Sequence, residues 1–97
     1  MTTRTRTYLA RRLDNNCEPV SGRPVRIPGW EEFEFFVHRP LSDSTDGWAV
    51  SEVRTGCKIV TVYGWSQKTV LIIARNTLNR MGRTALEDAI ATRGAIA

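Results

Sequence analysis

The stretch from Gly47 to Gly82 limits the possible folds more than any other part of this chain of 97 residues. At its start, Trp48 and Val50 alternate with smaller residues, and residues 57–63 form a second run rich in strand-forming side chains. Between them, Arg54-Thr55-Gly56 is typical of a hairpin turn in which the glycine takes a positive φ. The pattern predicts two antiparallel strands joined by a short turn.

The same stretch continues directly into a helix. Ser66 is a side chain that caps helix N-termini, and Gly82 is the residue type that closes C-termini. Apolar residues recur at spacings of three and four along residues 67–81, which predicts one long amphipathic helix. A shorter second helix is expected over residues 85–93, opened by a capping box at Thr84.

A further strand is expected before this stretch. Phe33, Phe35 and Val37 alternate with their neighbours as in a strand with one buried face, and Pro40 ends the run. Short connections place consecutive strands side by side, and the apolar stripe of the helix needs a sheet to cover. The sequence therefore predicts an α+β fold in which a three-stranded antiparallel meander is packed by one long helix, with a short C-terminal helix.

The first 29 residues show little regular pattern. Thr and Arg alternate near the start, and Pro19, Pro24 and Pro28 exclude a continuous helix. We expect an irregular basic N-terminal segment over residues 1–29, punctuated by Pro and Gly, and a β-β-β-α-α domain over residues 30–97. The segment either lies along the sheet or orders on a partner.

Charge is distributed unevenly along the chain. The net charge of +4 divides into +4 for residues 1–30, −5 for residues 31–52 and +5 for residues 53–97. These blocks either form a face for phosphate or acidic protein, or pair with one another across the sheet.

Twelve of the fourteen basic residues are Arg, which binds phosphate and carboxylate with a planar fork. This excess reflects either an interface or the codon usage of a GC-rich genome. We predict a partner-binding role for the basic side chains and for Trp65, which lies at the corner between strand and helix and serves either the core or an interface. The candidate partner-binding residues are Arg4, Arg6, Arg11, Arg12, Arg23, Arg26, Trp65, Lys68 and Arg75.

The sequence offers no pattern of a catalytic or metal-binding site. His38 is the single histidine, and Cys17 and Cys57 stand in no metal-binding spacing. The glutamates within residues 31–34 suit a solvated face better than a pair of catalytic carboxylates. No phosphate-binding glycine motif occurs. We therefore expect a protein that is not an enzyme and that holds no metal or cofactor.

Gly64, Ser66 and Lys68 form a Gly-x-Ser-x-Lys junction between strand and helix, with Ala74 further along the helix. The chain resembles double-stranded-RNA-binding domains in this junction, over about residues 33–81. The resemblance implies that Lys68 meets phosphate near the positive end of the helix. Only Lys68 matches that family's basic positions, because Gln67 stands where the family has a second lysine.

Trp48 with Val50, the Thr55-Gly56 turn and the helix start at Ser66 also resemble small accessory proteins of phages and mobile elements. That loose group includes anti-CRISPR proteins, which act without catalysis by covering a nucleic-acid-binding surface or a joint between subunits. This resemblance implies an inhibitor that docks on a host protein or ribonucleoprotein complex, such as a CRISPR effector.

Together these patterns predict a non-catalytic binding protein, with a direct RNA- or DNA-binding module as the alternative and a subunit that pairs through a strand edge as a third possibility. No apolar run approaches the roughly 18 residues that cross a bilayer, and residues 1–12 lack a signal-peptide pattern. We expect no membrane association and a cytoplasmic location, in the host cell if a phage encodes the protein. The sequence leaves the oligomeric state open.

Overall fold

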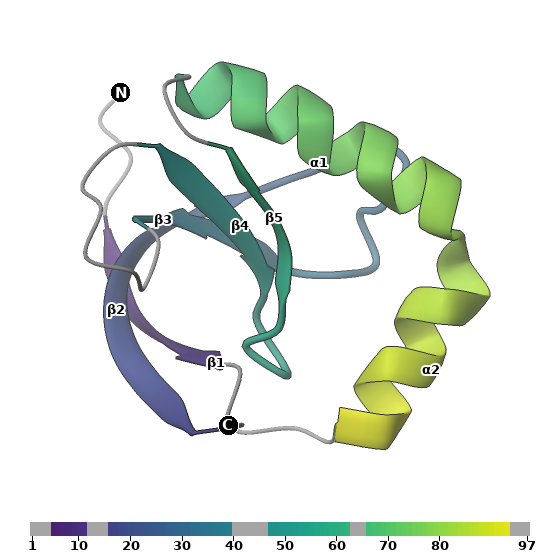
Figure 1. Ribbon diagram of the computed structural model, residues 1–97, viewed down its shortest axis with the longest axis horizontal. Helices are drawn as coiled ribbons and strands as arrows, with labels where there is room; N and C mark the ends of the chain where they lie inside the picture. Colours follow the sequence, from purple (N-terminus) through teal and green to yellow (C-terminus); the bar gives the residue numbers. More distant parts are fainter. Residues whose placement is uncertain (1–4, 12–15, 40–46, 63–65, 94–97) are drawn as a thin grey trace.

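The computed structural model describes residues 5–11, 16–39, 47–62 and 66–93. Within these residues, five strands form one antiparallel sheet in the order β1-β2-β3-β4-β5, and two helices follow (Figure 1). The elements are β1 (Arg6–Arg11), β2 (Cys17–Val25), β3 (Phe35–His38), β4 (Trp48–Glu52), β5 (Lys58–Val62), α1 (Gln67–Met81) and α2 (Arg83–Arg93). The predicted α+β class is confirmed, but the sheet has five strands where three were predicted.

The two additional strands lie in the segment that we expected to be irregular. β1 and β2 pair in unbroken register from Arg6 opposite Gly22 to Arg11 opposite Cys17. β2 then pairs with β3, so that Val25 lies opposite Phe35. The prediction of an irregular N-terminal segment was wrong for these residues, because backbone pairing and aromatic contacts made far along the chain stabilise strands whose own side chains show no alternation.

The two prolines of β2 occupy positions where a missing N–H costs little. The amide of Arg11 donates to the carbonyl of Gly56 at 2.8 Å, on the edge of β1 that faces away from β2. Because backbone groups alternate in direction along a strand, the N–H and C=O groups of Leu9 also point away from β2. Its partner Pro19 therefore makes no backbone hydrogen bond to β1, and its missing N–H costs nothing there. Pro24 lies beyond the last described β1 pair, so no described residue of β1 needs its N–H.

The sheet curls strongly, as Figure 1 shows. Only Gly22–Val25 of β2 pair with β3, so the first half of β2 extends past β3 together with β1. This hairpin folds over one face of the remaining strands. The Tyr8 ring of β1 stacks on Phe36 of β3 at 4.4 Å between centroids and 8° between planes, and the bond from Arg11 to Gly56 joins β1 to the β4–β5 turn.

Because of this curl, β3 is buried on both faces. Phe35 and Val37 face α1, as predicted from their alternation, and Phe36 and His38 face the β1–β2 hairpin with 0% and 3% exposure. The expectation of a sheet with one buried face is therefore wrong for β3. The signal was missed because the covering hairpin had not been predicted.

α1 covers the other face of the sheet with the stripe Val70, Ala74 and Leu78. Ser66 accepts a hydrogen bond from the Thr69 amide at 3.2 Å, and the Gly82 amide donates to the Leu78 carbonyl at 2.8 Å. Both predicted ends of the helix are confirmed. The core beneath it consists of Ile27, Trp30, Phe35, Val37, Val50, Val70, Ala74, Leu78 and Leu86.

α2 begins at Arg83, two residues before the predicted start. Thr84 therefore lies inside the helix, and the predicted capping box was wrong. Gly82 takes a φ of 88°, which allows the chain to leave α1 and enter α2 without a longer loop. Among the described residues, neither helix is long and apolar enough to cross a membrane.

Candidate functional site

The structure separates the predicted partner-binding residues into three groups. Arg4, Arg12 and Trp65 lie outside the described residues. Arg11 and Arg23 contribute to the fold itself, and the other four side chains are exposed. The exposed candidates are Arg6, Arg26, Lys68 and Arg75.

Arg11 and Arg23 each hold distant segments together. The Arg11 Nε donates to the Thr55 carbonyl at 2.9 Å, which fixes β1 against the β4–β5 turn. The Arg23 Nε donates to Oε1 of Gln67 at 2.9 Å and so ties β2 to the first turn of α1. Both side chains are half-buried. Their guanidinium groups therefore stabilise the fold, whether or not a partner is bound.

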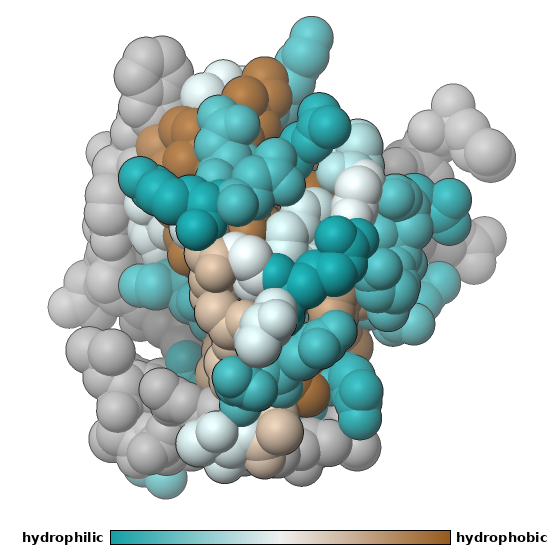
Figure 2. Space-filling model, turned by 90° about the vertical axis from the view of Figure 1, so that its right-hand side faces the viewer, coloured by the Kyte–Doolittle hydropathy of each residue, from teal (hydrophilic) through white to brown (hydrophobic). Residues whose placement is uncertain are grey.

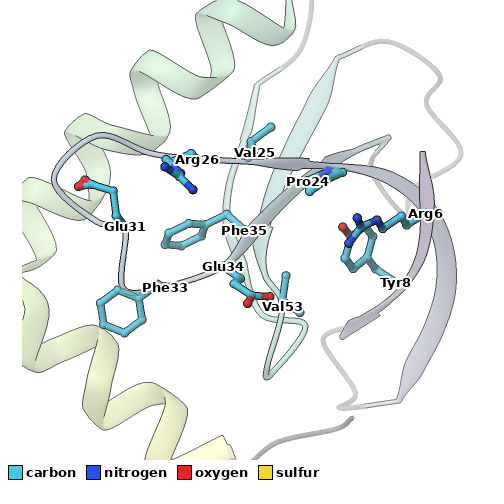
Figure 3. Close-up of a pocket in the computed structure, with 10 residues that line it drawn as sticks. All are labelled: Arg6, Tyr8, Pro24, Val25, Arg26, Glu31, Phe33, Glu34, Phe35 and Val53. Atoms are coloured by element: carbon cyan, nitrogen blue, oxygen red, sulfur yellow. The ribbon is translucent and has the colours of Figure 1, made fainter. Parts of the chain in front are cut away.

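Arg6 and Arg26 line an open hollow of about 440 Å³ at the mouth of the curled sheet. In Figure 3, Arg26, Glu31 and Phe33 lie toward one end of this hollow, and Arg6 and Tyr8 lie at the other. Its lining comes from β1, from the end of β2, from the loop that leads into β3, from the first residue of β3, and from the residue after β4. The lining residues are Arg6, Tyr8, Pro24, Val25, Arg26, Glu31, Phe33, Glu34, Phe35 and Val53.

The hollow has an aromatic wall that other contacts hold in place. Phe35 is fully buried, and Phe33 lies between Phe35 and Trp30 at centroid distances of 6.4 and 5.9 Å. Tyr8 is held by its stack on Phe36. Aromatic rings that are already fixed lose little freedom when a partner covers them. The hollow therefore presents aromatic rings whose positions are already set by the fold, beside the polar and charged groups of its lining.

Charges of both signs surround this wall. Within the described part of the chain, the guanidinium groups of Arg6 and Arg26 form no hydrogen bond or ion pair, and neither does the Glu34 carboxylate. Glu31 differs, because both its oxygens accept from the Gly29 amide at 2.8 Å and so brace the loop. Two cations and one carboxylate remain available to a ligand.

Lys68 and Arg75 belong to a different surface, the outer side of α1. They lie four residues before and three residues after Ile72, so the three side chains share one stripe. Ile72 is 55% exposed, the largest value among the exposed large hydrophobic residues of the described chain. Figure 2 shows apolar surface among hydrophilic residues on the side of the molecule that carries the helices.

His38 makes the contacts of a possible catalytic base but lies out of reach. Its Nδ1 donates to the Arg39 carbonyl at 2.6 Å, which leaves Nε2 to accept from the Ser51 hydroxyl at 2.8 Å. Burial lowers the pKa of His38. A histidine beside a serine is the arrangement of a base and its nucleophile. However, Ser51 and His38 are 1% and 3% exposed, so no substrate reaches either group.

Other candidate centres are not assembled. Cys17 and Cys57 are free thiols, and no group of three or more metal-ligating side chains gathers within the described ranges. Trp30 is a core residue whose Nε1 donates to Asn79 at 2.9 Å.

Four residues of the two surfaces were not predicted. Tyr8 and Phe33 were missed as surface features because the hollow depends on the curl of the sheet, and Glu34 was taken as part of a solvated face. Ile72 carried a readable signal, since it is the one isoleucine of the helix outside the predicted apolar stripe.

The chain matches no protein family, no curated protein sequence and no solved structure.

Proposed function

We propose that this chain is a non-catalytic binding protein that docks on a partner protein, alone or within a nucleoprotein complex, and that the hollow receives a segment of that partner. The observation that carries the proposal is the pair of guanidinium groups of Arg6 and Arg26, which have no partner among the described residues and lie at the two ends of a hollow, each beside an aromatic ring held by the fold (Figure 3). Aromatic and Arg side chains are enriched at protein interfaces and supply most of their binding energy.

The mixed charge of the hollow supports a polypeptide ligand over naked nucleic acid. Sites that hold nucleic acid surround the phosphates with positive charge. The unpartnered Glu34 carboxylate lies in the same lining as Arg6 and Arg26 and would repel a phosphate chain. A protein segment can offer a carboxylate to each Arg and a donor to Glu34, which uses both signs.

The resemblance to phage accessory proteins adds a class of target. We propose an inhibitor that blocks the nucleic-acid engagement of a host complex, of the anti-CRISPR type. The alternative proposal is a direct RNA- or DNA-binding module, for which the three basic residues of α1, with no acidic residue in that helix, are the supporting observation.

A pull-down from host lysate, with and without nuclease, tests the proposal. The bait is the wild type beside the variant Arg6→Glu/Arg26→Glu. A control variant, Arg54→Glu/Lys58→Glu, changes the net charge equally at exposed residues outside both the hollow and α1. We expect one protein to be retained after nuclease treatment by the wild type and the control, and to be lost with the hollow variant.

Two results would overturn the proposal. One is retention of the same protein by the hollow variant, which would show that the hollow is not the docking site. The other is retention of nucleic acid alone. In that case the purified protein should bind a DNA duplex with a steep salt dependence. A plot of log K against the logarithm of the salt concentration should have a slope of about −0.9 for each phosphate neutralised.

A further inference from the structure

A second surface, on the outer side of α1, is chemically different from the hollow. Lys68, Ile72 and Arg75 form one stripe along this side, which we call the α1 stripe. No acidic residue occurs between Gln67 and Met81, so every charged side chain of the helix is a cation. The hollow combines both signs of charge, whereas the α1 stripe combines one sign with an exposed aliphatic side chain.

The cations of the α1 stripe have no partner in the part of the chain that the structure describes. Neither Lys68 nor Arg75 forms a hydrogen bond or ion pair with the described residues. Elsewhere the chain does pair such groups, since Arg83 contacts Glu32 at 2.9 Å and lies over the Trp30 ring. The α1 stripe is therefore a surface whose charges are left for another molecule.

Ile72 indicates the class of that molecule. A single exposed aliphatic residue needs no explanation by itself. Here, however, the aliphatic side chain is 55% exposed and stands between two cations at helical spacing. An apolar centre with a charged rim is the usual anatomy of a protein interface.

Phosphate contacts would not explain Ile72, and the α1 stripe has too few cations for a nucleic acid. Affinity for nucleic acid from counterion release grows with the number of phosphates neutralised, and two cations neutralise only about two. Two cations around an apolar centre instead match a protein face that carries carboxylates around an apolar contact.

We infer that the α1 stripe is a second docking surface, and that its occupant is a carboxylate-bearing protein face with an apolar contact for Ile72. This inference does not depend on the hollow. The two surfaces together would let one small chain hold two separate parts of its target.

Binding of a defined probe to the full chain tests the inference. The probe is a fluorescent helical peptide with leucines on one face and glutamates beside them, and a peptide of the same composition in scrambled order is the reference. A 20-base-pair DNA duplex provides the polyanion arm. Fluorescence anisotropy measures the affinity of each for the wild type, Ile72→Ser, Arg75→Glu and the matched control Arg54→Glu, with circular dichroism to verify that every variant is folded.

We expect the acidic amphipathic peptide to bind at least tenfold more tightly than its scrambled form. Ile72→Ser and Arg75→Glu should each weaken that binding at least tenfold, and Arg54→Glu should leave it within twofold. Equal binding of the scrambled peptide, tighter binding of the duplex, no effect of Ile72→Ser, or no binding of the acidic peptide would each overturn the inference. None of these results depends on whether the hollow variant loses its partner.

Discussion

Glu52 holds Thr55 by two hydrogen bonds from a buried position at the end of β4. Its Oε1 accepts from the Thr55 amide at 3.0 Å and from the Thr55 hydroxyl at 2.9 Å, and its other oxygen accepts from the Arg54 amide at 2.7 Å. The carboxylate is 1% exposed. One acidic side chain thus organises the β4–β5 turn. The Gly56 carbonyl of this turn accepts a hydrogen bond from the Arg11 amide of β1.

Replacing Glu52 should therefore destabilise the whole sheet. Glu52→Ala leaves three donors without their acceptor and should lower the free energy of unfolding by about 2–4 kcal/mol. Glu52→Gln keeps one acceptor oxygen and should cost about half as much. Urea unfolding measures both, with Glu87→Ala on the exposed side of α2 as the control, expected within about 0.5 kcal/mol of wild type. Equal stability of Glu52→Ala and the control would contradict a structural role for this carboxylate.

Stability should also depend on the protonation of His38. Burial lowers the pKa of His38 below its usual value of 6.5, the positive charge of Lys58 lowers it further, and the bond to the Arg39 carbonyl opposes both effects. As the pH falls below 6.5, the unfolded chain takes up a proton that folded His38 still resists, so stability should decrease in that direction. Well above pH 6.5, where His38 is neutral in both the folded and the unfolded chain, it should contribute no pH dependence.

Urea unfolding between pH 5 and pH 8 measures this effect. His38→Gln keeps polar atoms at the site but cannot titrate, so its unfolding free energy should depend less on pH below 6.5 than that of the wild type. If the variant and the wild type lose stability in parallel as the pH falls, other groups account for the dependence.

The close approach between β2 and β3 gives a third prediction. A Cβ at Gly22 would lie 3.0 Å from the Phe36 ring, 3.1 Å from the Val37 carbonyl and 3.2 Å from the Tyr8 ring. Gly22→Ala should lower the free energy of unfolding by about 1–3 kcal/mol, because the stacked rings and the backbone cannot all move aside. Thermal unfolding of this variant beside Ser21→Ala, an exposed neighbour, measures the effect. Similar melting temperatures for the two variants would show that the stack between Tyr8 and Phe36 yields easily.

The sequence predicted α1 almost completely and the start of the sheet hardly at all. Ser66, Gly82 and the apolar stripe are local signals. They determine the start, the end and the buried face of the helix, and none of them depends on contacts with distant residues. β1 and β2 carry no such signal. Their strands exist because Tyr8 stacks on Phe36 and because Arg11 reaches Gly56, contacts between residues far apart in the sequence.

The same reason limits how far the candidate site could be predicted. Arg6 and Arg26 were expected to bind a partner from their charge alone, and that role stays a prediction. Arg6 and Arg26 line one hollow together with Phe33 and Tyr8 because the sheet curls. The spacing of residues in the sequence does not predict this curl. Charge also failed to separate Arg23 from Arg26, although the structure gives them different surroundings.

This difference between Arg23 and Arg26 gives the last prediction. Arg23 is half-buried and bound to Gln67, whereas Arg26 is exposed at the hollow and has no partner among the described residues. Arg23→Ala should lower the free energy of unfolding by about 1 kcal/mol or more, since a charge-assisted hydrogen bond between β2 and α1 is lost. Arg26→Ala should change it by no more than about 0.5 kcal/mol. Urea unfolding of the two variants in parallel measures this contrast, and Gln67→Ala should resemble Arg23→Ala because it removes the other half of the same bond. If Arg26→Ala proved as destabilising as Arg23→Ala, Arg26 would be a structural residue, and its place in the proposed binding surface would have to be given up.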